Sequence, residues 1–188
     1  PQLAALAPSA ELQAAVQQPG LSHAAIIATI LDGYADRPMV GERAYEIAAD
    51  PATGRAARRL LPRYTTRTYA GIRARVEALA CALRNRPQHR LGIDEFVCIL
   101  GFSSVDYLCV ELAAVYCHGV TVPLQSSLAG TDLGRIFADT ACRQLVATID
   151  DLPLAAQHAA ASGTIRSLVA IDYDPRDDEE RAKFAAAP

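Results

Sequence analysis

The sequence predicts an α/β fold, with a mostly parallel sheet flanked by helices. In the second half of the chain, four short apolar runs of strand length alternate with amphipathic stretches of helical length. Runs that are apolar throughout are typical of strands covered on both faces, and strand–helix–strand connections make the sheet parallel with right-handed crossovers. The 188 residues suffice for one substantial domain or for part of a larger one.

Two helices are predicted over the first 38 residues. The first stretch is alanine-rich and weakly patterned, whereas the second has Ser22 as its N-cap and ends before Pro38. Its apolar residues recur at helical spacing: Ile26, Ile27, Ile30, Leu31 and Tyr34. We therefore divide the chain into an N-terminal helical region, residues 1–38, and an α/β region, residues 39–188.

A β-hairpin with a capped helix behind it opens the α/β region. Two short extended runs between Tyr45 and Tyr64 flank the segment 50–54, whose proline and glycine supply a turn. Thr68 then caps a helix that ends before Pro87. One face of this helix carries apolar residues and the other carries arginines; the apolar residues are Ile72, Val76, Leu79, Ala80 and Leu83.

The strand–helix alternation follows, with strands predicted at residues 96–100, 120–124, 144–149 and 167–172. The helix after the first strand is expected to end at Gly119. Two further helices are expected to open at Thr131-Asp132 and at Asp150-Asp151 with Pro153. The buried face of the first helix is predicted to carry Val105, Leu108, Cys109, Leu112, Val115 and Tyr116.

A short last helix is predicted after Asp174-Pro175, which we assign as its cap. Its first turn is acidic and its later part carries Arg181 and Lys183, an arrangement that matches the helix dipole. The acidic residues, Asp177, Asp178, Glu179 and Glu180, lack the alternating spacing and the glycine of a calcium loop. We therefore interpret this stretch as a solvated helix start rather than a cation site.

Composition excludes several classes of function. With 51% hydrophobic residues, 21% charged residues and a formal net charge of −3, the chain lacks the positive charge that drives binding to nucleic acid or anionic membranes. No basic segment precedes an apolar run at the start, and no apolar run is long enough to span a bilayer, so a cytoplasmic protein is expected. Because the chain starts without methionine and ends at Pro188, we expect a piece of a longer protein.

Cysteine and histidine spacing argues against a metal site. The five cysteines form no C-x-x-C pair and lie in apolar segments, so they are expected to be buried thiols of a reducing compartment. No histidine stands at metal-ligand spacing from another histidine or from a cysteine. These residues are Cys81, Cys98, Cys109, Cys117, Cys142, His23, His89, His118 and His158.

The loops at the carboxyl ends of the strands are the expected place for chemistry in such a sheet. The loop after the first strand has one glycine, Gly101, and matches neither a dinucleotide fingerprint nor a P-loop. Ser103 and Ser104 can meet a phosphate or cap the next helix, and we favour the cap. The segment 125–127, Gln-Ser-Ser, can present hydroxyls to a ligand, or it can serve as a cap or a turn, and we favour the cap or turn.

Asp106 and Tyr107, on the helix after the first strand, can bond another part of a larger protein, although a surface or packing role is favoured. The chain has no serine in a G-x-S-x-G motif and no histidine–carboxylate pair at a suggestive spacing. The residues by themselves therefore predict an α/β domain without catalytic, cofactor-binding or metal-binding residues.

Several segments, taken in order, resemble the adenylate-forming enzymes. Residues 61–69 contain a threonine–tyrosine pair that opens a helix, like the first core motif of that superfamily, and residues 112–124 are similar to the second core motif. Four segments are similar to carboxylic acid reductases in particular: 50–55, 101–107, 123–127 and 171–175. The resemblance covers the chain from about Met39 onward and is less distinctive before it. Gly71 departs from the family, which usually carries a glutamate there that completes a capping box.

The resemblance implies the first, incomplete α/β subdomain of an adenylation domain, belonging to an ATP- and NADPH-dependent reductase. In such enzymes a carboxylic acid and ATP, with magnesium, form acyl-AMP, a phosphopantetheine thiol takes the acyl group, and NADPH reduces it to the aldehyde. The expected partners are the rest of the adenylation domain and the carrier and reductase domains.

No catalytic residue is carried over from the family to this chain. The family's phosphate loop, its ribose-binding aspartate and its catalytic lysine lie beyond this segment, so the segment alone is expected to be inactive. Two alternatives remain: a fragment of a fatty-acyl-CoA or acyl-AMP ligase, and a non-catalytic α/β binding domain.

Overall fold

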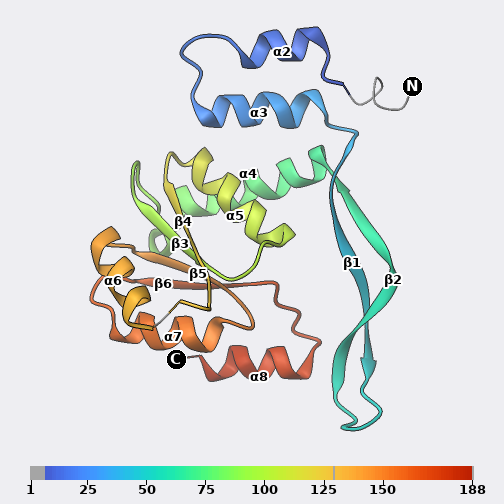
Figure 1. The fold of residues 1–188 in the computed structure, drawn as a ribbon, viewed down its shortest axis with the longest axis vertical. Coiled ribbons are helices and arrows are strands. Elements are labelled where there is room, and N and C mark those ends of the chain that lie inside the picture. The colour runs from blue at the N-terminus through green and yellow to red at the C-terminus, as the bar shows by residue number, and fades with distance from the viewer. Residues whose placement is uncertain (1–6, 129, 188) are drawn as a thin grey trace.

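The computed structural model describes residues 7–128 and 130–187. A parallel sheet lies between two layers of helices, a pair of N-terminal helices packs at one end, and a long hairpin runs along one side (Figure 1). This architecture confirms the α/β fold predicted from the sequence. Residues 1–6 of the predicted helical region and Pro188 lie outside the described residues. Within the described part of the chain, no helix is long and apolar enough to cross a membrane.

Four parallel strands form the sheet, in the order β4-β3-β5-β6. They are β3 (Phe96–Leu100), β4 (Val120–Leu124), β5 (Gln144–Thr148) and β6 (Ser167–Ile171), within one residue of the predicted bounds. The two central strands are apolar and buried because both of their faces are covered. The pattern of continuous apolar runs therefore identified the strands correctly.

Two apolar clusters, one on each face of the sheet, form the core. Val97 and Ile99 of β3 face α4 (Tyr69–Asn85) and α5 (Val105–Tyr116), whereas Cys98 and Leu100 face the other layer. That layer consists of α6 (Gly130–Thr140) and α7 (Leu152–Ala161). The predicted apolar face of α4 is confirmed, with Ile72, Val76, Ala80 and Leu83 buried.

Helix α5 buries only part of the predicted face. Val105 and Cys109 are buried as predicted, whereas Leu108, Leu112, Val115 and Tyr116 are only partly buried. The other buried residues of the helix are Tyr107, Val110, Ala113 and Ala114. The helix packs against both the sheet and α4, so small side chains occupy the closest contacts. The spacing of apolar residues in the sequence predicts one buried face, and it does not show that the helix packs against both the sheet and α4.

Helix α5 ends just before Gly119, as predicted, but the residue that takes the left-handed conformation at its end is His118. His118, at φ 58°, takes the left-handed conformation, and the Gly119 amide donates to the Ala114 carbonyl at 2.9 Å. This is the Schellman pattern, with histidine where glycine is usual. Gly119 is needed for another reason: an added Cβ would lie 2.6 Å from Leu91 Cδ2.

The N-terminal helices are α2 (Ala10–Val16) and α3 (His23–Gly33). Their N-caps are Ser9 and Ser22, whose hydroxyls accept from the amides of Leu12 and Ala25 at 3.1 and 3.2 Å. Helix α3 packs against α4 and α5, and α2 packs against α3, so this pair extends the helical layer on one face of the sheet (Figure 1).

The hairpin is much longer than predicted. Its strands are β1 (Pro38–Ala49) and β2 (Ala56–Thr68), antiparallel and paired over nearly their whole length. Asp50 accepts from the Ala52 and Thr53 amides at 2.9 and 2.8 Å, and Gly54 has φ 70°, which closes the predicted turn. The outer parts of both strands were not predicted because the ribbon is largely exposed and its polar residues lack the apolar pattern of a buried strand.

Replacing Gly71 is expected to stabilise α4. Gly71 is exposed at the third position of the helix, its amide donates to the Thr68 hydroxyl at 3.2 Å, and an added Cβ would meet nothing closer than 3.5 Å. Gly71→Ala should therefore raise the free energy of unfolding by about 0.5–1 kcal/mol. Gly71→Glu should add a few tenths of a kcal/mol (roughly 0.3) through the helix dipole. Urea unfolding of the two variants checks this; an unchanged or lower midpoint would contradict it.

Candidate functional site

A cleft of about 400 Å³ opens at the carboxyl edge of the sheet. The loops after β3, β4, β5 and β6 meet there because the carboxyl ends of parallel strands share one edge. Residues of the hairpin and of α8 (Asp178–Ala186) complete the wall. The lining residues are Arg58, Phe102, Ser103, Ser104, Ser126, Thr148, Ile149, Asp150, Asp151, Asp172 and Glu180.

The loop after β3 approaches β5 without room for a side chain. Gly101 has φ 140°, and an added Cβ would collide with Thr148. The Ser104 hydroxyl accepts from the Tyr107 amide at 3.1 Å, so Ser104 is the N-cap of α5, as favoured from the sequence. Ser103 is exposed and lines the cleft, and Phe102 is 79% exposed beside it.

The loop after β4 forms the expected turn, since the Leu128 amide donates to the Gln125 carbonyl at 3.1 Å. Ser126 nevertheless lines the cleft. In the loop after β5, Asp151 accepts from the Thr148 hydroxyl at 2.8 Å and precedes α7. Serine and threonine side chains therefore line the cleft from three loops.

Carboxylates outnumber cations in this cleft. Asp150, Asp151, Asp172 and Glu180 line it, against the single guanidinium of Arg58. Burial raises the pKa of Asp172 above its ordinary value, and burial likewise raises the pKa of Glu180. A wall of this sign repels the phosphate chain of a nucleotide, so the described residues do not fit that ligand by themselves.

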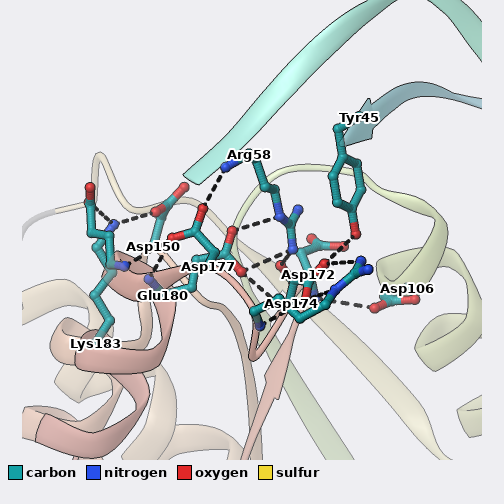
Figure 2. A network of polar contacts seen from close by, with 11 residues as sticks. Tyr45, Arg58, Asp106, Asp150, Asp172, Asp174, Asp177, Glu180 and Lys183 are labelled. Atoms are coloured by element: carbon teal, nitrogen blue, oxygen red, sulfur yellow. Dashed lines mark hydrogen bonds and ion pairs between the residues drawn. The ribbon is translucent and has the colours of Figure 1, made fainter. Parts of the chain in front are cut away.

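Arg58, on strand β2 of the hairpin, bonds the turn after β6 and helix α8 (Figure 2). Its Nη2 donates to the Asp172 carbonyl at 2.7 Å and to Glu180 Oε2 at 3.0 Å, and its Nε lies 2.8 Å from Glu180 Oε1. The guanidinium carbon lies over the Tyr45 ring, 4.6 Å from its centroid. Two-pronged pairing of this kind is specific to arginine. The sequence did not predict this role of Arg58, because its partners are more than 100 residues away along the chain.

The acidic stretch after β6 opens a helix as predicted, but it packs against the hairpin, so the prediction that it is solvated is wrong. Asp177 accepts from the Arg58 amide at 2.8 Å, and Asp178 accepts from the Ala56 amide at 2.8 Å. Both carboxylates thus bond backbone amides of β2, whose edge has no other strand among the described residues. Asp177 is buried, with 6% of its surface exposed.

The cap of α8 is Asp177 and not the predicted Asp174-Pro175. Asp177 accepts from the Glu179 and Glu180 amides at 3.0 and 3.1 Å, so the helix begins three residues later than expected. Asp174, 5% exposed, instead accepts from the Tyr45 hydroxyl at 3.0 Å and from Arg176 Nη2 at 2.7 Å. The Arg176 guanidinium holds the pKa of Asp174 well below its usual range.

Asp106 contacts its own domain, which agrees with the favoured surface or packing role. Its carboxylate pairs with Arg75 and accepts from the Asp172 amide at 3.2 Å, while Tyr107 is buried. Asp172, at φ 59°, reverses the chain between these contacts. Arg75, Asp106 and the turn after β6 therefore connect α4, α5 and the acidic stretch.

The cysteines, the histidines and Lys183 are the remaining residues considered in the sequence. Cys98, Cys109, Cys117 and Cys142 are buried as expected, but Cys81 is exposed on α4. Within residues 7–128 and 130–187, no cluster of three histidine, cysteine or acidic side chains is arranged to hold a metal ion. Lys183 forms ion pairs with Asp150 and Glu179, each at 2.7 Å. No catalytic or cofactor-binding residue was predicted, and that expectation stays a prediction.

The family model for AMP-binding enzymes matches residues 46–188. The chain belongs to the AMP-binding enzyme family. Within it, the chain is 39% identical over 186 residues to the carboxylic acid reductase of Mycobacterium tuberculosis, a match that covers 99% of this chain and 16% of that relative. The chain thus spans about a sixth of the relative's length.

Solved structures agree with this assignment. The A domain of the carboxylic acid reductase from Segniliparus rugosus, in complex with AMP and a co-purified carboxylic acid, has a TM-score of 0.94 at 36% identity; the match covers all of this chain and 30% of that chain. A putative long-chain-fatty-acid CoA ligase from Rhodopseudomonas palustris has a TM-score of 0.53 at 21% identity over 58% of this chain and 28% of that chain. The chain therefore corresponds to the N-terminal portion of the adenylation domain of carboxylic acid reductases, including the N-terminal helices, where the resemblance in the sequence is less distinctive.

Removing the Arg58 side chain is expected to destabilise the domain strongly. Arg58→Ala leaves Glu180, whose side chain is 12% exposed, without its counter-charge, and should cost about 2 kcal/mol, less than for a fully buried pair because Arg58 is partly exposed. Arg59→Ala, at a neighbouring arginine that pairs with Glu46 on the exposed face, should cost less than about 0.5 kcal/mol. Equal losses for the two variants in urea unfolding would show that the Arg58 contacts add nothing.

Acid is expected to weaken the same contacts. Amide donors lower the pKa of Asp178, and for Asp177 the amides outweigh the opposing effect of burial; with Asp174, three carboxyls have folded-state pKa values below the unfolded ones. Such groups stabilise the fold above about pH 4, and this contribution is lost as pH falls further. The raised pKa values of Asp172 and Glu180 act in the opposite sense, so a single-residue variant is needed.

Asp174→Asn should be less stable than the unchanged chain at pH 6 and should lose less stability between pH 4 and pH 3. Urea midpoints at the three pH values measure this difference. Asp139→Asn, at an exposed position of α6, is the matched control and should follow the unchanged chain. Parallel pH curves for Asp174→Asn and the unchanged chain would rule out the assigned role of Asp174.

Proposed function

We propose that this chain is the scaffold portion of the adenylation domain of a carboxylic acid reductase, and that it has no catalytic activity alone. The observation that carries the proposal is the TM-score of 0.94, at 36% identity over the whole chain, to the A domain that holds AMP and a carboxylic acid. Residues 39–188 would form its first, incomplete α/β subdomain, and residues 1–38 its N-terminal helical region.

The proposed reaction of the parent enzyme begins with activation of a carboxylate. A carboxylate oxygen attacks the α-phosphorus of ATP, acyl-AMP forms and pyrophosphate leaves, so a poor leaving group is replaced by a good one. The thiol of a phosphopantetheine arm would then displace AMP, and hydride from NADPH together with a proton would convert the thioester to the aldehyde and release the free thiol. This chain supplies the sheet and its carboxyl edge; ATP, magnesium, phosphopantetheine and NADPH are assigned to other parts of the parent enzyme.

The residues that line the cleft at the carboxyl edge support the proposal that this segment alone is inactive. It lacks a serine-, threonine- and glycine-rich loop, and its four carboxylates oppose a triphosphate. Phe102, 79% exposed beside the cleft, offers an apolar side chain that a neighbouring subdomain would cover. No step of the reaction is assigned to a residue of this chain.

A fatty-acyl-CoA or acyl-AMP ligase remains the second candidate, on the strength of the shared sheet alone. Its weaker support is the TM-score of 0.53 over 58% of the chain. The reading frame that contains this segment distinguishes the two. A carrier-domain serine motif and a Rossmann glycine motif downstream would support the reductase, and their absence would exclude it.

ATP–pyrophosphate exchange tests whether the segment is inactive. Purified 1–188 should show no exchange above background with benzoate or with octanoate, because the sequence has no phosphate loop to hold ATP. A chimera of residues 1–188 with the remaining part of the Segniliparus rugosus A domain should exchange, with the unmodified A domain as the positive control. Exchange by 1–188 alone, or a folded chimera without exchange, would refute the proposal.

A further inference from the structure

A second cleft, of about 350 Å³, opens at the amino edge of the sheet, opposite the carboxyl-edge cleft. The segments just before β3, β5 and β6 meet there, together with the short helix η1 (Pro87–His89). The parallel topology gathers these segments for the same reason that it gathers the carboxyl ends. The cleft is lined by Pro87, Gln88, Arg90, Gly92, Glu95, Arg143, Gln144 and Arg166.

This cleft is positively charged. Arg90, Arg143 and Arg166 line it, and Glu95 is the one acidic residue in its wall. Arg143 pairs with Glu95 at 3.1 Å, which leaves the guanidinium groups of Arg90 and Arg166 without a partner among the described residues. Three arginines from three separate segments thus carry a net excess of two positive charges into one concave surface. Guanidinium groups bind oxyanions with two parallel hydrogen bonds.

Gln144 supplies the second observation. Its side chain is buried, with 2% of the residue exposed, and its Nε2 donates to the His89 carbonyl at 2.7 Å. That bond fixes the amide, since the reversed amide would place two oxygens together. The other atom, Oε1, is buried and has no hydrogen-bond partner among the described residues. A buried acceptor without a donor is costly, so this atom favours a ligand that donates.

We propose that the amino-edge cleft binds a tetrahedral oxyanion that keeps a hydroxyl group, of which inorganic phosphate is the simple case. Arg90, Arg143 and Arg166 pair with the anionic oxygens, and the hydroxyl donates to Gln144 Oε1. Sulfate has the same shape, and a charge at least as large as that of phosphate near pH 6, but no hydroxyl, so it satisfies the arginines and not Gln144. A carboxylate lacks the donor for the same reason.

Binding is tested with the whole 188-residue chain at pH 6, using phosphate, sulfate and chloride at matched ionic strength. Thermal unfolding gives the stabilisation by each ion, and NMR titration gives the dissociation constant and the shift of the Gln144 side-chain amide. Phosphate should bind several-fold more tightly than sulfate, and chloride should give no saturable effect. Equal binding of phosphate and sulfate, or no saturable binding of either, would overturn the proposal.

Two variants separate the two parts of the site. Arg166→Ala should weaken phosphate and sulfate alike, by about tenfold, which is the loss of one charge-assisted pair. Gln144→Met keeps the volume and should abolish the preference for phosphate while sulfate binding stays unchanged. Arg135→Ala, at an exposed arginine of α6 outside the cleft, is the control and should bind both ions as the unchanged chain does.

The source of the oxyanion is distinguished with methyl phosphate, an ester that still carries a hydroxyl for part of its population at pH 6. Methyl phosphate binding within a few-fold of inorganic phosphate would assign the site to phosphate monoesters. Binding of inorganic phosphate alone would assign it to the free ion. A Gln144→Met variant that retained the full preference for phosphate over sulfate would refute the role given to Gln144, and with it the proposal.

Discussion

The contacts of Arg58 with Asp172 and Glu180 are the constraint on which the arrangement of the peripheral parts depends. The sheet and its covering helices have continuous apolar cores, but the hairpin has few buried residues of its own. Two-stranded ribbons are marginally stable by themselves. The hairpin is held instead by ion pairs and by carboxylates that bond its backbone, from a stretch that also caps α8 and shapes the cleft.

The acidic stretch also covers part of the exposed edge of strand β2, where another chain could otherwise pair. Asp177 and Asp178 accept hydrogen bonds from the amides of Arg58 and Ala56, groups that an unpaired strand would otherwise offer to another chain. Carboxylates are suited to this purpose because they accept several bonds and add negative charge to the edge. The cost of burying Asp174 and Asp177 is offset by the arginine and the amides around them.

Patterns of short range predicted most of the fold. The strands were located because their apolar runs are continuous, and the caps Ser22, Thr68 and Ser104 were found because capping acts over three residues. Part of the buried face of α5, the length of the hairpin and the contacts of the acidic stretch were not predicted. Each is decided by a partner far along the chain, and no local spacing of Arg58 or Asp177 indicates that partner.

The separation of these partners also bears on synthesis. The bond between Ala56 and Asp178 spans 122 residues, so the hairpin leaves the ribosome long before the segment that secures it. At typical rates of translation that interval is roughly 6 to 24 seconds. During it, the long exposed ribbon has no anchor at its far end, and a chaperone or an early-folding neighbour would have to keep it from pairing with other nascent chains.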